Sequence, residues 1–485
     1  MITAAEMAVV DANAAALGVP RKQLMESSGN AVARAVRATV DPDSSVAVVC
    51  GRGNNGGDAM VAARFLDGYD VTVSLLGRAE TITTRISREN WDALLECEYD
   101  AHEVRDSAAL DLGDPDLVVD AMLGTGVTGD LREPERSAAL AVNELDAPVL
   151  SVDVPSGLDC ERGDLADNAV EADHVVTFHD EKPGLAALDC EVTVADIGIP
   201  DAAERFVGNG DLTRIERDPA SHKGGNGEVL VVGGGPYTGA PALSAQAALR
   251  GGADLVRVAC PEGVAREVQG YSENLILTPF AGDHLVPGHA NRLLAAAAEH
   301  DTVVFGPGLG DHEETLEAVR TFLGEYEGTA VVDADALQVV PEVETGATLV
   351  CTPHQGELRK MGGETSGDWE ERAAMVESFA AELGHTLLVK GVYDVVSDGE
   401  RTRISRTGNA AMTVGGTGDV LAGVTAALSS VLDPHDAACV AAYANGRAGD
   451  LVVEGGAGDP PRGNGLLATD LVAAMPTALT PEVVE

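Results

Sequence analysis

The chain has 485 residues, in which 79 Asp and Glu residues outnumber 32 Lys and Arg residues and give a formal net charge of −47. At about 100–200 residues per domain, this length predicts two to four domains with buried cores. A chain so acidic repels both a nucleic-acid backbone and an anionic membrane surface, so we expect neither as a partner.

The chain also lacks the usual marks of secretion. Its N-terminal stretch has no basic start of the kind a signal peptide needs, and no apolar run approaches the roughly 18 residues of a membrane-spanning helix. The seven cysteines are far apart and form no CxxC pair, which argues against a disulfide framework or a cysteine zinc site. We therefore expect a soluble, cytoplasmic protein.

The first half of the chain alternates short β-branched runs with Ala-rich helical stretches such as 59–66. The β-branched runs predict strands over residues 46–50, 71–76, 117–121, 149–154 and 174–178. This rhythm is typical of βαβ units, which build a parallel sheet with helices on both faces. Ligands of such sheets bind at the carboxyl ends of the strands.

The rhythm stops over residues 198–228, a polar stretch punctuated by Gly and Pro, and we expect two domains, 1–210 and 211–485. A second series of strands is then predicted over residues 228–235, 253–260, 301–308, 329–337, 348–353 and 386–391. The predicted fold class is therefore α/β, with two doubly wound domains.

A glycine-rich loop, CGRGNNGGD, follows the first strand and opens a helix. Gly51, Gly53, Gly56 and Gly57 let the backbone come close to a ligand, so that several N–H groups can converge on an anion. A tight glycine turn without a ligand is the alternative. The polar atoms of Asn54, Asn55 and Asp58 favour binding, because a simple turn does not need them.

Two further strands end in similar polar loops, VVDAMLGTGVTGDL (118–131) and SVDVPSGLD (151–159). Because parallel strands end at one sheet edge, Asn55, Asp120 and Ser156 can offer hard oxygen ligands to one cation. With a single carboxylate among them, a monovalent ion is favoured over magnesium. In the alternative interpretation, Asp120 only caps a helix.

These motifs, together with VTFHDEKPGL (176–185), resemble the NAD(P)H-hydrate epimerase family, and all four occur in the family's order across roughly residues 1–210. The resemblance implies a Rossmann-like domain that binds K⁺ through Asn55, Asp120 and Ser156. It implies that Asp153 lies near the reacting ring, and we add Lys182 as a second candidate catalytic residue. The implied substrate-binding residues are Asn54, Asn55, Gly56, Gly57, Asp58, Gly124, Thr125, Gly126, Val127, Thr128, Gly129, Asp130 and Asp153.

In the second half, GNAAMTVGGTGD (408–419) leads into an apolar run that is typical of a helix. The N–H groups of its GGTG segment can stabilise a phosphoryl group in transfer. Asp419 would then accept the proton of a substrate hydroxyl that attacks phosphorus. In the alternative interpretation, Asp419 caps a helix that begins at Val420.

Other segments of this half favour a site of the nucleotide-kinase kind. GPGLG (306–310) follows a buried strand, DADAL (333–337) places Asp333 at a strand end, and VKGVYD places Lys390 at another. CTPHQGE places His354 and Glu357 on a loop, where His354 has either a binding or a purely structural role.

These segments and HKGGNGEVLVVGGGPYTG (222–239) resemble the ADP-dependent NAD(P)H-hydrate dehydratase family of the ribokinase-like superfamily, over roughly residues 211–485. The resemblance implies that the hydrated nucleotide contacts Ala240, Gly308, His354 and Asp419. The implied adenine-nucleotide site comprises Lys390, Gly391, Val392, Tyr393, Asp394 and Gly418.

Both resemblances together imply a bifunctional repair enzyme for NADHX and NADPHX, the hydrates of NADH and NADPH. The first domain would exchange the R and S epimers with K⁺. The second would dehydrate the S epimer with ADP and Mg²⁺, releasing AMP and phosphate. The alternative is a ribokinase-type small-molecule kinase with a non-catalytic nucleotide-binding N-terminal module.

The composition also bears on the source of the chain. Abundant scattered acids, five lysines and few aromatic residues favour a haloarchaeal protein, because carboxylates hold water and salt screens their repulsion. A mesophilic protein with an unusually acidic surface is the alternative. We also expect a homo-oligomer.

Overall fold

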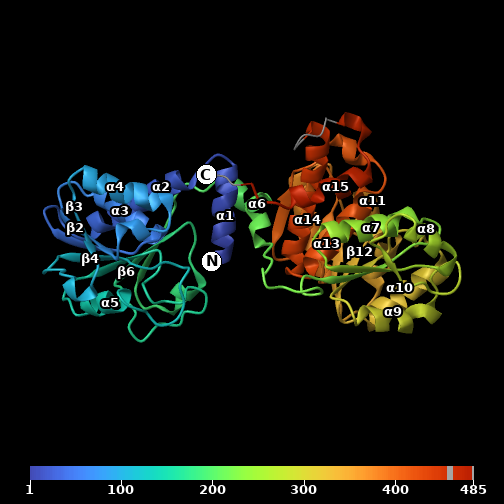
Figure 1. Cartoon of the computed structure of the whole chain (residues 1–485), viewed down its shortest axis with the longest axis horizontal. Coiled ribbons are helices and arrows are strands. Elements are labelled where there is room, and N and C mark those ends of the chain that lie inside the picture. Colours follow the sequence, from blue (N-terminus) through green and yellow to red (C-terminus); the bar gives the residue numbers. More distant parts are fainter. Residues whose placement is uncertain (456–461, 483–485) are drawn as a thin grey trace. The chain divides into compact units, whose positions relative to one another are not determined.

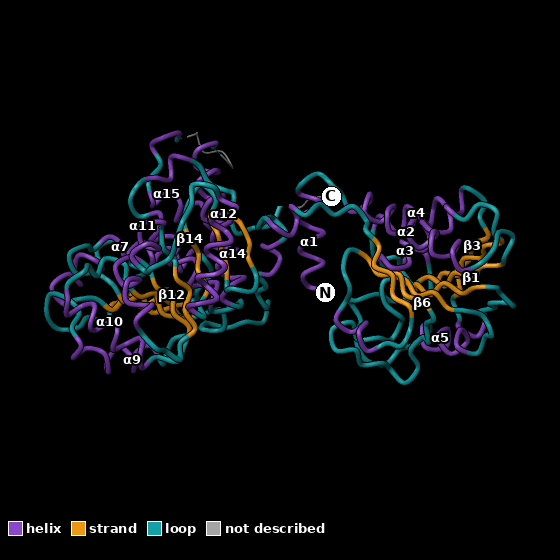
Figure 2. The backbone as a smooth tube through the Cα atoms, turned by 180° about the vertical axis from the view of Figure 1, so that it is seen from behind, coloured by secondary structure: helices purple, strands orange, loops and turns teal. Residues whose placement is uncertain are grey.

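The computed structural model describes residues 1–455 and 462–482, which form two compact units, residues 1–201 and 202–482 (Figure 1). In each unit a sheet lies between helices, as the tube view shows (Figure 2). The two doubly wound α/β domains predicted from the sequence are confirmed.

The first unit contains a parallel sheet in the order β3-β2-β1-β4-β5-β6-β7. Strands β1 to β3 are added towards one edge of the sheet and β4 to β7 towards the other, so the strand order reverses between β1 and β4. Sheets of this kind bind their ligands at such a reversal. The strands are β1 (Ser45–Cys50), β2 (Asp70–Leu76), β3 (Asp100–Val104), β4 (Leu117–Ala121), β5 (Val149–Val152), β6 (His174–Phe178) and β7 (Glu191–Ala195).

Helices cover both faces of this sheet (Figure 1). The helices α2, α3 and α4 lie on one face, and α5 lies on the other (Figures 1 and 2). Their bounds are α1 (Ala4–Ala16), α2 (Arg21–Thr39), α3 (Asn54–Phe65), α4 (Arg85–Glu96) and α5 (Glu135–Asn143).

The second unit contains a sheet in the order β10-β9-β8-β11-β12-β13-β14-β15-β16. It is parallel up to β14, and β15 and β16 are antiparallel. The strands are β8 (Glu228–Val232), β9 (Leu255–Ala259), β10 (Ile276–Leu277), β11 (Thr302–Phe305), β12 (Thr329–Val332), β13 (Thr348–Cys351), β14 (Thr386–Val389), β15 (Asp394–Ser397) and β16 (Thr402–Ser405).

Its core has two layers because successive strand residues face opposite sides of the sheet. Val229 and Val231 of β8 belong to one core, whereas Leu230 and Val232 belong to the other. The helices of this unit are α6 (Ala202–Arg205), α7 (Gly239–Arg250), α8 (Ala265–Gln269), α9 (Ala290–Ala297), α10 (Glu313–Glu325), α11 (Gln355–Lys360), α12 (Trp369–Leu383), α13 (Thr417–Ser429), α14 (Pro434–Glu454) and α15 (Ala468–Ala478).

The helix α13 is central to the first of these cores. Its residues from Val420 to Leu428 are all buried, and it packs between α7 and α14. A helix that is apolar all round is stable only when neighbours cover it on every side. The start of α13, which carries Asp419, is therefore held in place by its surroundings.

The units divide between Asp201 and Ala202, nine residues before the boundary that the sequence predicts. Residues 202–210 belong to the second unit because Phe206 bridges to Ile404 of β16, and the Val207 N–H donates to the Ile404 carbonyl at 2.9 Å. The polar composition of residues 198–228 identified a connecting stretch. It did not show at which residue the chain stops contacting the first unit and begins to contact the second.

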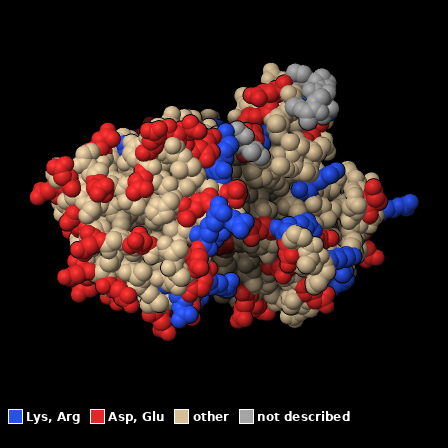
Figure 3. All heavy atoms as spheres, turned by 60° about the vertical axis from the view of Figure 1, so that its left-hand side comes forward, with Lys and Arg blue, Asp and Glu red and all other residues tan. Residues whose placement is uncertain are grey.

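Acidic side chains are spread over the face of the molecule drawn in Figure 3, where they outnumber Lys and Arg. They do not gather into one patch that would mark a basic partner. Among the described residues, no helix is long and apolar enough to span a membrane.

We expect added salt to stabilise this fold. Raising KCl from 0.1 to 2 M shortens the Debye length from about 10 Å to below about 3 Å, so repulsion among the surface carboxylates fades. The midpoint of thermal unfolding, followed by circular dichroism, should therefore rise. KBr should act like KCl, since screening depends on ionic strength; a midpoint that stays constant or falls in both salts would contradict the electrostatic explanation.

Candidate functional site

The glycine-rich loop after β1 turns directly into α3. Gly53 is the N-cap, and the first helical bond runs from the Gly57 N–H to the Gly53 carbonyl at 3.2 Å. The N–H groups of Asn54, Asn55 and Gly56 thus precede the helical ladder, where a helix start favours an anion. Gly56 is required here because a Cβ would lie 2.2 Å from the Gly51 carbonyl oxygen.

The helix begins five residues earlier than the helical stretch predicted from 59. The NNGGD run is therefore the first turn of α3 rather than a loop before it. Gly57 faces inward as well, since a Cβ there would meet Ser87 Oγ at 2.4 Å. Both glycines serve the close packing of this turn, and neither lines the cavity described below.

The three residues predicted to bind a cation lie together at the ends of β1, β4 and β5. Ser156 donates to Asp120 through its Oγ at 2.6 Å and through its backbone N–H at 2.9 Å. Leu123 joins them to Asn55: its N–H donates to Ser156 Oγ at 3.0 Å, and its carbonyl accepts from Asn55 Nδ2 at 2.8 Å. Asp120 lies in β4 and caps no helix.

This cluster has an unfilled acceptor. Asn55 Oδ1 is buried and has no hydrogen-bond partner among the described residues. Burial raises the pKa of Asp120 above its usual value, although the bonds from Ser156, Met122 and Ser151 lower it. A buried carboxylate beside an orphaned amide oxygen suits a cation with oxygen ligands. The donor set therefore fits K⁺.

Asp153 and Lys182 form an ion pair in the same unit, in which Lys182 is buried and Asp153 is partly buried. Lys182 Nζ lies 2.8 Å from Asp153 Oδ1, and its side chain is only 1% exposed. The ammonium also donates to Thr177 Oγ1 at 3.0 Å and to the Phe178 carbonyl at 2.8 Å. Asp153 has a left-handed backbone, with φ 64°, a conformation that Asp tolerates better than most residues. Such strain is common at functional sites.

Asn55, Asp153 and Lys182 line one cavity of about 790 Å³, whereas Asp120 and Ser156 lie outside its lining. It brings together the ends of three strands, as the sequence predicts. The predicted residues that line it are Asn54, Asn55, Asp58, Gly124, Thr125, Gly126, Val127, Asp153 and Lys182. Thr128, Gly129 and Asp130 lie outside its lining, further along the loop after β4.

The structure adds Asp11 of α1 to this cavity, a residue that sequence reasoning did not select. Burial raises its pKa to about 6, and the nearby Arg21 and Lys182 lower it while Asp153 raises it. Burial also raises the pKa of Asp58 well above its usual value, although its bond with Ser28 lowers it. No local motif marks Asp11, because only the tertiary fold brings α1 to the cavity.

In the second unit, Asp419 lies in the first turn of α13, whose N-cap is Gly416 with φ 99°. The helix begins at Thr417, so Asp419 is not the cap of a helix that begins at Val420. Burial raises the pKa of Asp419 to about 7; Asp333 adds to the rise, and Lys390 opposes it. A carboxyl with such a pKa can accept a proton near neutral pH.

Lys390 is the cation of this site. Its Nζ lies 3.0 Å from Asp333 Oδ1 and 3.9 Å from Glu357 Oε2. Burial lowers the pKa of Lys390, but the carboxylates of Asp333 and Glu357 raise it overall, so the ammonium stays charged. A Cβ on Gly418 would lie 3.1 Å from this Nζ. Glycine at 418 therefore lets the ammonium approach the start of α13.

His354 is the N-cap of α11. Its Nδ1 accepts from the Glu357 N–H at 2.9 Å, while Glu357 Oε2 accepts from the His354 N–H at 2.8 Å. The sequence predicted either a binding or a structural role for His354, and the structure shows the structural one, capping of α11. The backbone of His354 bridges to that of Lys390, which places it at the same sheet edge. Substrate binding by its imidazole stays a prediction.

Two further predicted groups lie at this edge. Gly308, with φ 74°, lies against α7, where its Cβ would come within 3.4 Å of Ala240 Cβ. Gly391, Val392, Tyr393 and Asp394 form a turn closed by the Gly391 N–H, which donates to Asp394 Oδ1 at 2.8 Å. Val392 at its tip is 88% exposed.

Each unit therefore holds a polar site at the carboxyl edge of a doubly wound sheet. This combination defines a two-domain α/β protein of the nucleotide-binding kind. Residues 21–184 match the family described as YjeF-related protein N-terminus, and residues 229–464 match the family described as NAD(P)H-hydrate dehydratase.

Similar proteins span the whole chain. It is 43% identical to a protein of Methanothermobacter thermautotrophicus named bifunctional NAD(P)H-hydrate repair enzyme Nnr, over 98% of this chain and 95% of that one. A protein of Pyrobaculum aerophilum with the same name is also 43% identical, over 99% and 98%. The chain belongs to the family of bifunctional NAD(P)H-hydrate repair enzymes.

A solved structure is similar to the second unit. An ADP/ATP-dependent NAD(P)H-hydrate dehydratase from Bacillus subtilis, co-crystallised with ATP and Mg²⁺, is 25% identical, with a TM-score of 0.48. The match covers 56% of this chain and 97% of that chain.

A double-mutant cycle tests the Asp153–Lys182 pair. Asp153→Asn keeps a residue that tolerates positive φ but leaves the Lys182 ammonium with neutral acceptors, and it should lower the free energy of unfolding by about 3 kcal/mol. Lys182→Met removes the buried charge itself and should cost less. In the Lys182→Met background, Asp153→Asn should then be nearly neutral.

The two tryptophans make the measurement specific, since Trp91 lies in the first unit and Trp369 in the second. Urea unfolding is followed by Trp91 fluorescence in a Trp369→Phe background. If the two single losses simply add in the double variant, the residues are not coupled.

Proposed function

We propose that the two units carry out the two steps of NAD(P)H-hydrate repair, with epimer exchange in the first and ADP-dependent dehydration in the second. Both named relatives cover the chain almost completely and carry this function in their names. The observation that carries the proposal is the start of α13, where Asp419, with a raised pKa, lies beside the charged Lys390.

Dehydration needs help because hydroxide is a poor leaving group. Asp419 accepts the proton of the C6 hydroxyl while that oxygen forms a bond to the terminal phosphorus of ADP. The phosphorus–oxygen bond to AMP breaks, and AMP leaves. Loss of phosphate from C6 and of a proton from C5 then restores the ring double bond. The N–H groups at the start of α13 and the Lys390 ammonium stabilise the negative charge of the phosphoryl group in transfer.

The donor set of this site fits Mg²⁺. Asp333, Glu357 and Asp419 place three carboxyl groups around one ammonium, so hard oxygen atoms and negative charge are in excess. When bound, Mg²⁺ neutralises phosphate charge. The protein itself binds the nucleotide through Lys390, Gly418 and the 391–394 turn, and orients the hydroxyl towards Asp419.

In the first unit, Asp153 and Lys182 lie where a proton must move. Exchange of the C6 epimers requires a bond at C6 to break and to form again on the other face, with a proton leaving and returning to an oxygen atom. Asp153 exchanges that proton, and Lys182 fixes its carboxylate. Burial raises the pKa of Asp11 to about 6, so it supplies the same cavity with a second carboxyl group that can take up and release a proton near neutral pH. Asn55, Asp120 and Ser156 would hold K⁺, which would supply positive charge next to the buried Asp120 carboxyl.

A ribokinase-type kinase with a non-catalytic N-terminal module is not favoured. The relatives named above are described as bifunctional and match nearly the whole chain, and the first unit has both the Asp153–Lys182 pair and the cluster of Asn55, Asp120 and Ser156. A kinase would leave a stable phosphorylated product, whereas repair releases free phosphate.

Finer points of the proposal come from the sequence. We propose a cytoplasmic, homo-oligomeric protein of a haloarchaeal cell, acting on both NADHX and NADPHX. The functional domains are proposed as residues 1–210 and 211–485. Assays therefore belong in high KCl, with ADP and Mg²⁺ as the donor system.

Two variants should separate the two activities. With hydrated NADH, ADP and Mg²⁺, the wild type should restore the reduced-nicotinamide absorbance from both epimers. Asp419→Asn should abolish recovery while the epimers still exchange. Asp153→Asn should recover only the S epimer, leaving the R epimer to accumulate. Failure of the wild type to recover any reduced nucleotide would reject the proposal.

The dehydratase should also lose activity below neutral pH. The pKa of Asp419 is raised to about 7 by burial, so below that pH the carboxyl carries a proton and cannot accept another. The value of kcat/KM for the S epimer, which reports on the free enzyme, should fall by about tenfold per pH unit below this value. A profile that stays flat from pH 8 to about 5.5 would exclude Asp419 as the base.

A further inference from the structure

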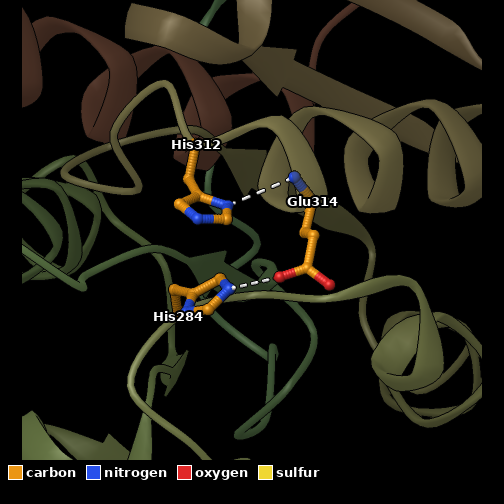
Figure 4. A group of neighbouring side chains, drawn as sticks. All are labelled: His284, His312 and Glu314. Atoms are coloured by element: carbon orange, nitrogen blue, oxygen red, sulfur yellow. Dashed lines mark hydrogen bonds and ion pairs between the residues drawn. The ribbon is translucent and has the colours of Figure 1, made fainter.

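Two histidines and a glutamate lie together in the second unit, and none of them is among the residues assigned above. His284 follows β10 in a loop, His312 is the N-cap of α10, and Glu314 lies in the first turn of that helix. One ligand atom from each residue lies within 4.8 Å of the others. Figure 4 shows the two imidazole rings and the carboxylate turned towards one another.

We propose that His284, His312 and Glu314 form a binding site for a divalent transition-metal ion of the Zn²⁺, Co²⁺ or Ni²⁺ class. Two imidazoles and one carboxylate are ligands that these ions prefer, whereas Mg²⁺ and K⁺ prefer oxygen alone. Water would complete the coordination, because all three side chains are at least partly exposed.

The present geometry is close to that of a tetrahedral site. His284 Nε2 lies 3.2 Å from Glu314 Oε2. Ligand bonds of about 2.0–2.1 Å at a tetrahedral angle place ligand atoms about 3.3 Å apart. Two of the three ligand atoms therefore already have the required spacing. The third, on His312, belongs to an exposed side chain that can approach without disturbing the core.

The two segments that supply the ligands are joined without the metal. Thr315 of α10 donates through its buried Oγ1 to the Leu285 carbonyl at 3.0 Å. The two imidazole rings are 4.4 Å apart between centroids. Two protonated rings at this distance would repel each other, whereas neutral rings can share a metal ion. The fold thus holds neighbouring ligands in place before an ion binds.

Metal binding has two costs. The hydrogen bond between His284 Nε2 and Glu314 Oε2 is lost, because the ion takes the place of its proton. His312 Nδ1 accepts the Glu314 N–H at 3.2 Å and so caps α10. An ion on Nδ1 takes up the same lone pair. An ion on Nε2 leaves the ring proton on Nδ1, which then no longer accepts. Either mode exchanges this cap for a metal bond.

The site lies near the loop that carries Gly308. His312 follows Gly310 by two residues, and a Cβ on Gly235 would lie 3.6 Å from the Gly308 carbonyl and 3.9 Å from that of Asp283. A bound ion would therefore tie the 283–285 segment to the start of α10 beside that loop. The metal site itself does not depend on the proposed function.

Co²⁺ alone is the probe for this site. The full chain is freed of metal with a chelator in 2 M KCl, which screens weak binding to surface carboxylates. Titration with Co²⁺ should give the intense visible absorption of four-coordinate cobalt with one equivalent bound, and Zn²⁺ should displace it. Octahedral Co²⁺ on carboxylates absorbs only weakly, so the acidic surface cannot imitate this result.

His284→Ala and Glu314→Gln should each abolish the band, while His174→Ala, a matched change in the first unit, should keep it. Circular dichroism confirms that each variant is folded. Absence of the band from the wild type, or a band of equal strength in His284→Ala and Glu314→Gln, would overturn the proposal.

Discussion

Both sites depend on one interaction, a lysine ammonium paired with an aspartate where the strands of a parallel sheet end. Lys182 pairs with Asp153 at 2.8 Å, and Lys390 pairs with Asp333 at 3.0 Å. A charge removed from water is tolerated only with a partner and further hydrogen bonds. The chain has only five lysines, and two of them form these pairs. A compact ammonium, unlike a guanidinium, fits these narrow positions.

The pairs divide the acids of each site into two kinds. Asp153 and Asp333 each lie against an ammonium, while burial raises the pKa of Asp11 to about 6 and that of Asp419 to about 7. A carboxyl group held by an ammonium and a second, buried carboxyl group in the same site can take different parts in proton transfer. The two sheets differ in strand order and in motifs, yet both produce this division.

Much of the fold could be predicted because the central strands are buried on both faces and read as continuous apolar runs. Every predicted strand is present. The strands that were not predicted, β3 and β7 in the first unit and β10, β15 and β16 in the second, lie at or next to sheet edges. The sequence of β3, DAHEV, shows why: a strand partly in water carries polar residues and lacks an apolar run.

The candidate sites could be predicted where a glycine or aspartate follows a strand, because the sheet itself gathers such residues at one edge. Asn55, Asp120 and Ser156 were found in this way. Asp11 could not be, since it lies on a helix that precedes the sheet and reaches the cavity only through tertiary packing. His284 and His312 come from separate loops, and no spacing in the sequence brings them together.

The start of α13 explains why an acid is compatible with an anion site. A carboxylate in the first turn of a helix is stabilised by the helix dipole, as a phosphate is, so the two compete for the same positive potential. Burial and the nearby Asp333 raise the pKa of Asp419 to about 7, so the carboxyl is uncharged for part of the time. Lys390, which approaches the turn because residue 418 is glycine, adds a second positive charge. The turn can therefore hold both an incoming phosphoryl group and Asp419, which we propose as the acceptor of the hydroxyl proton.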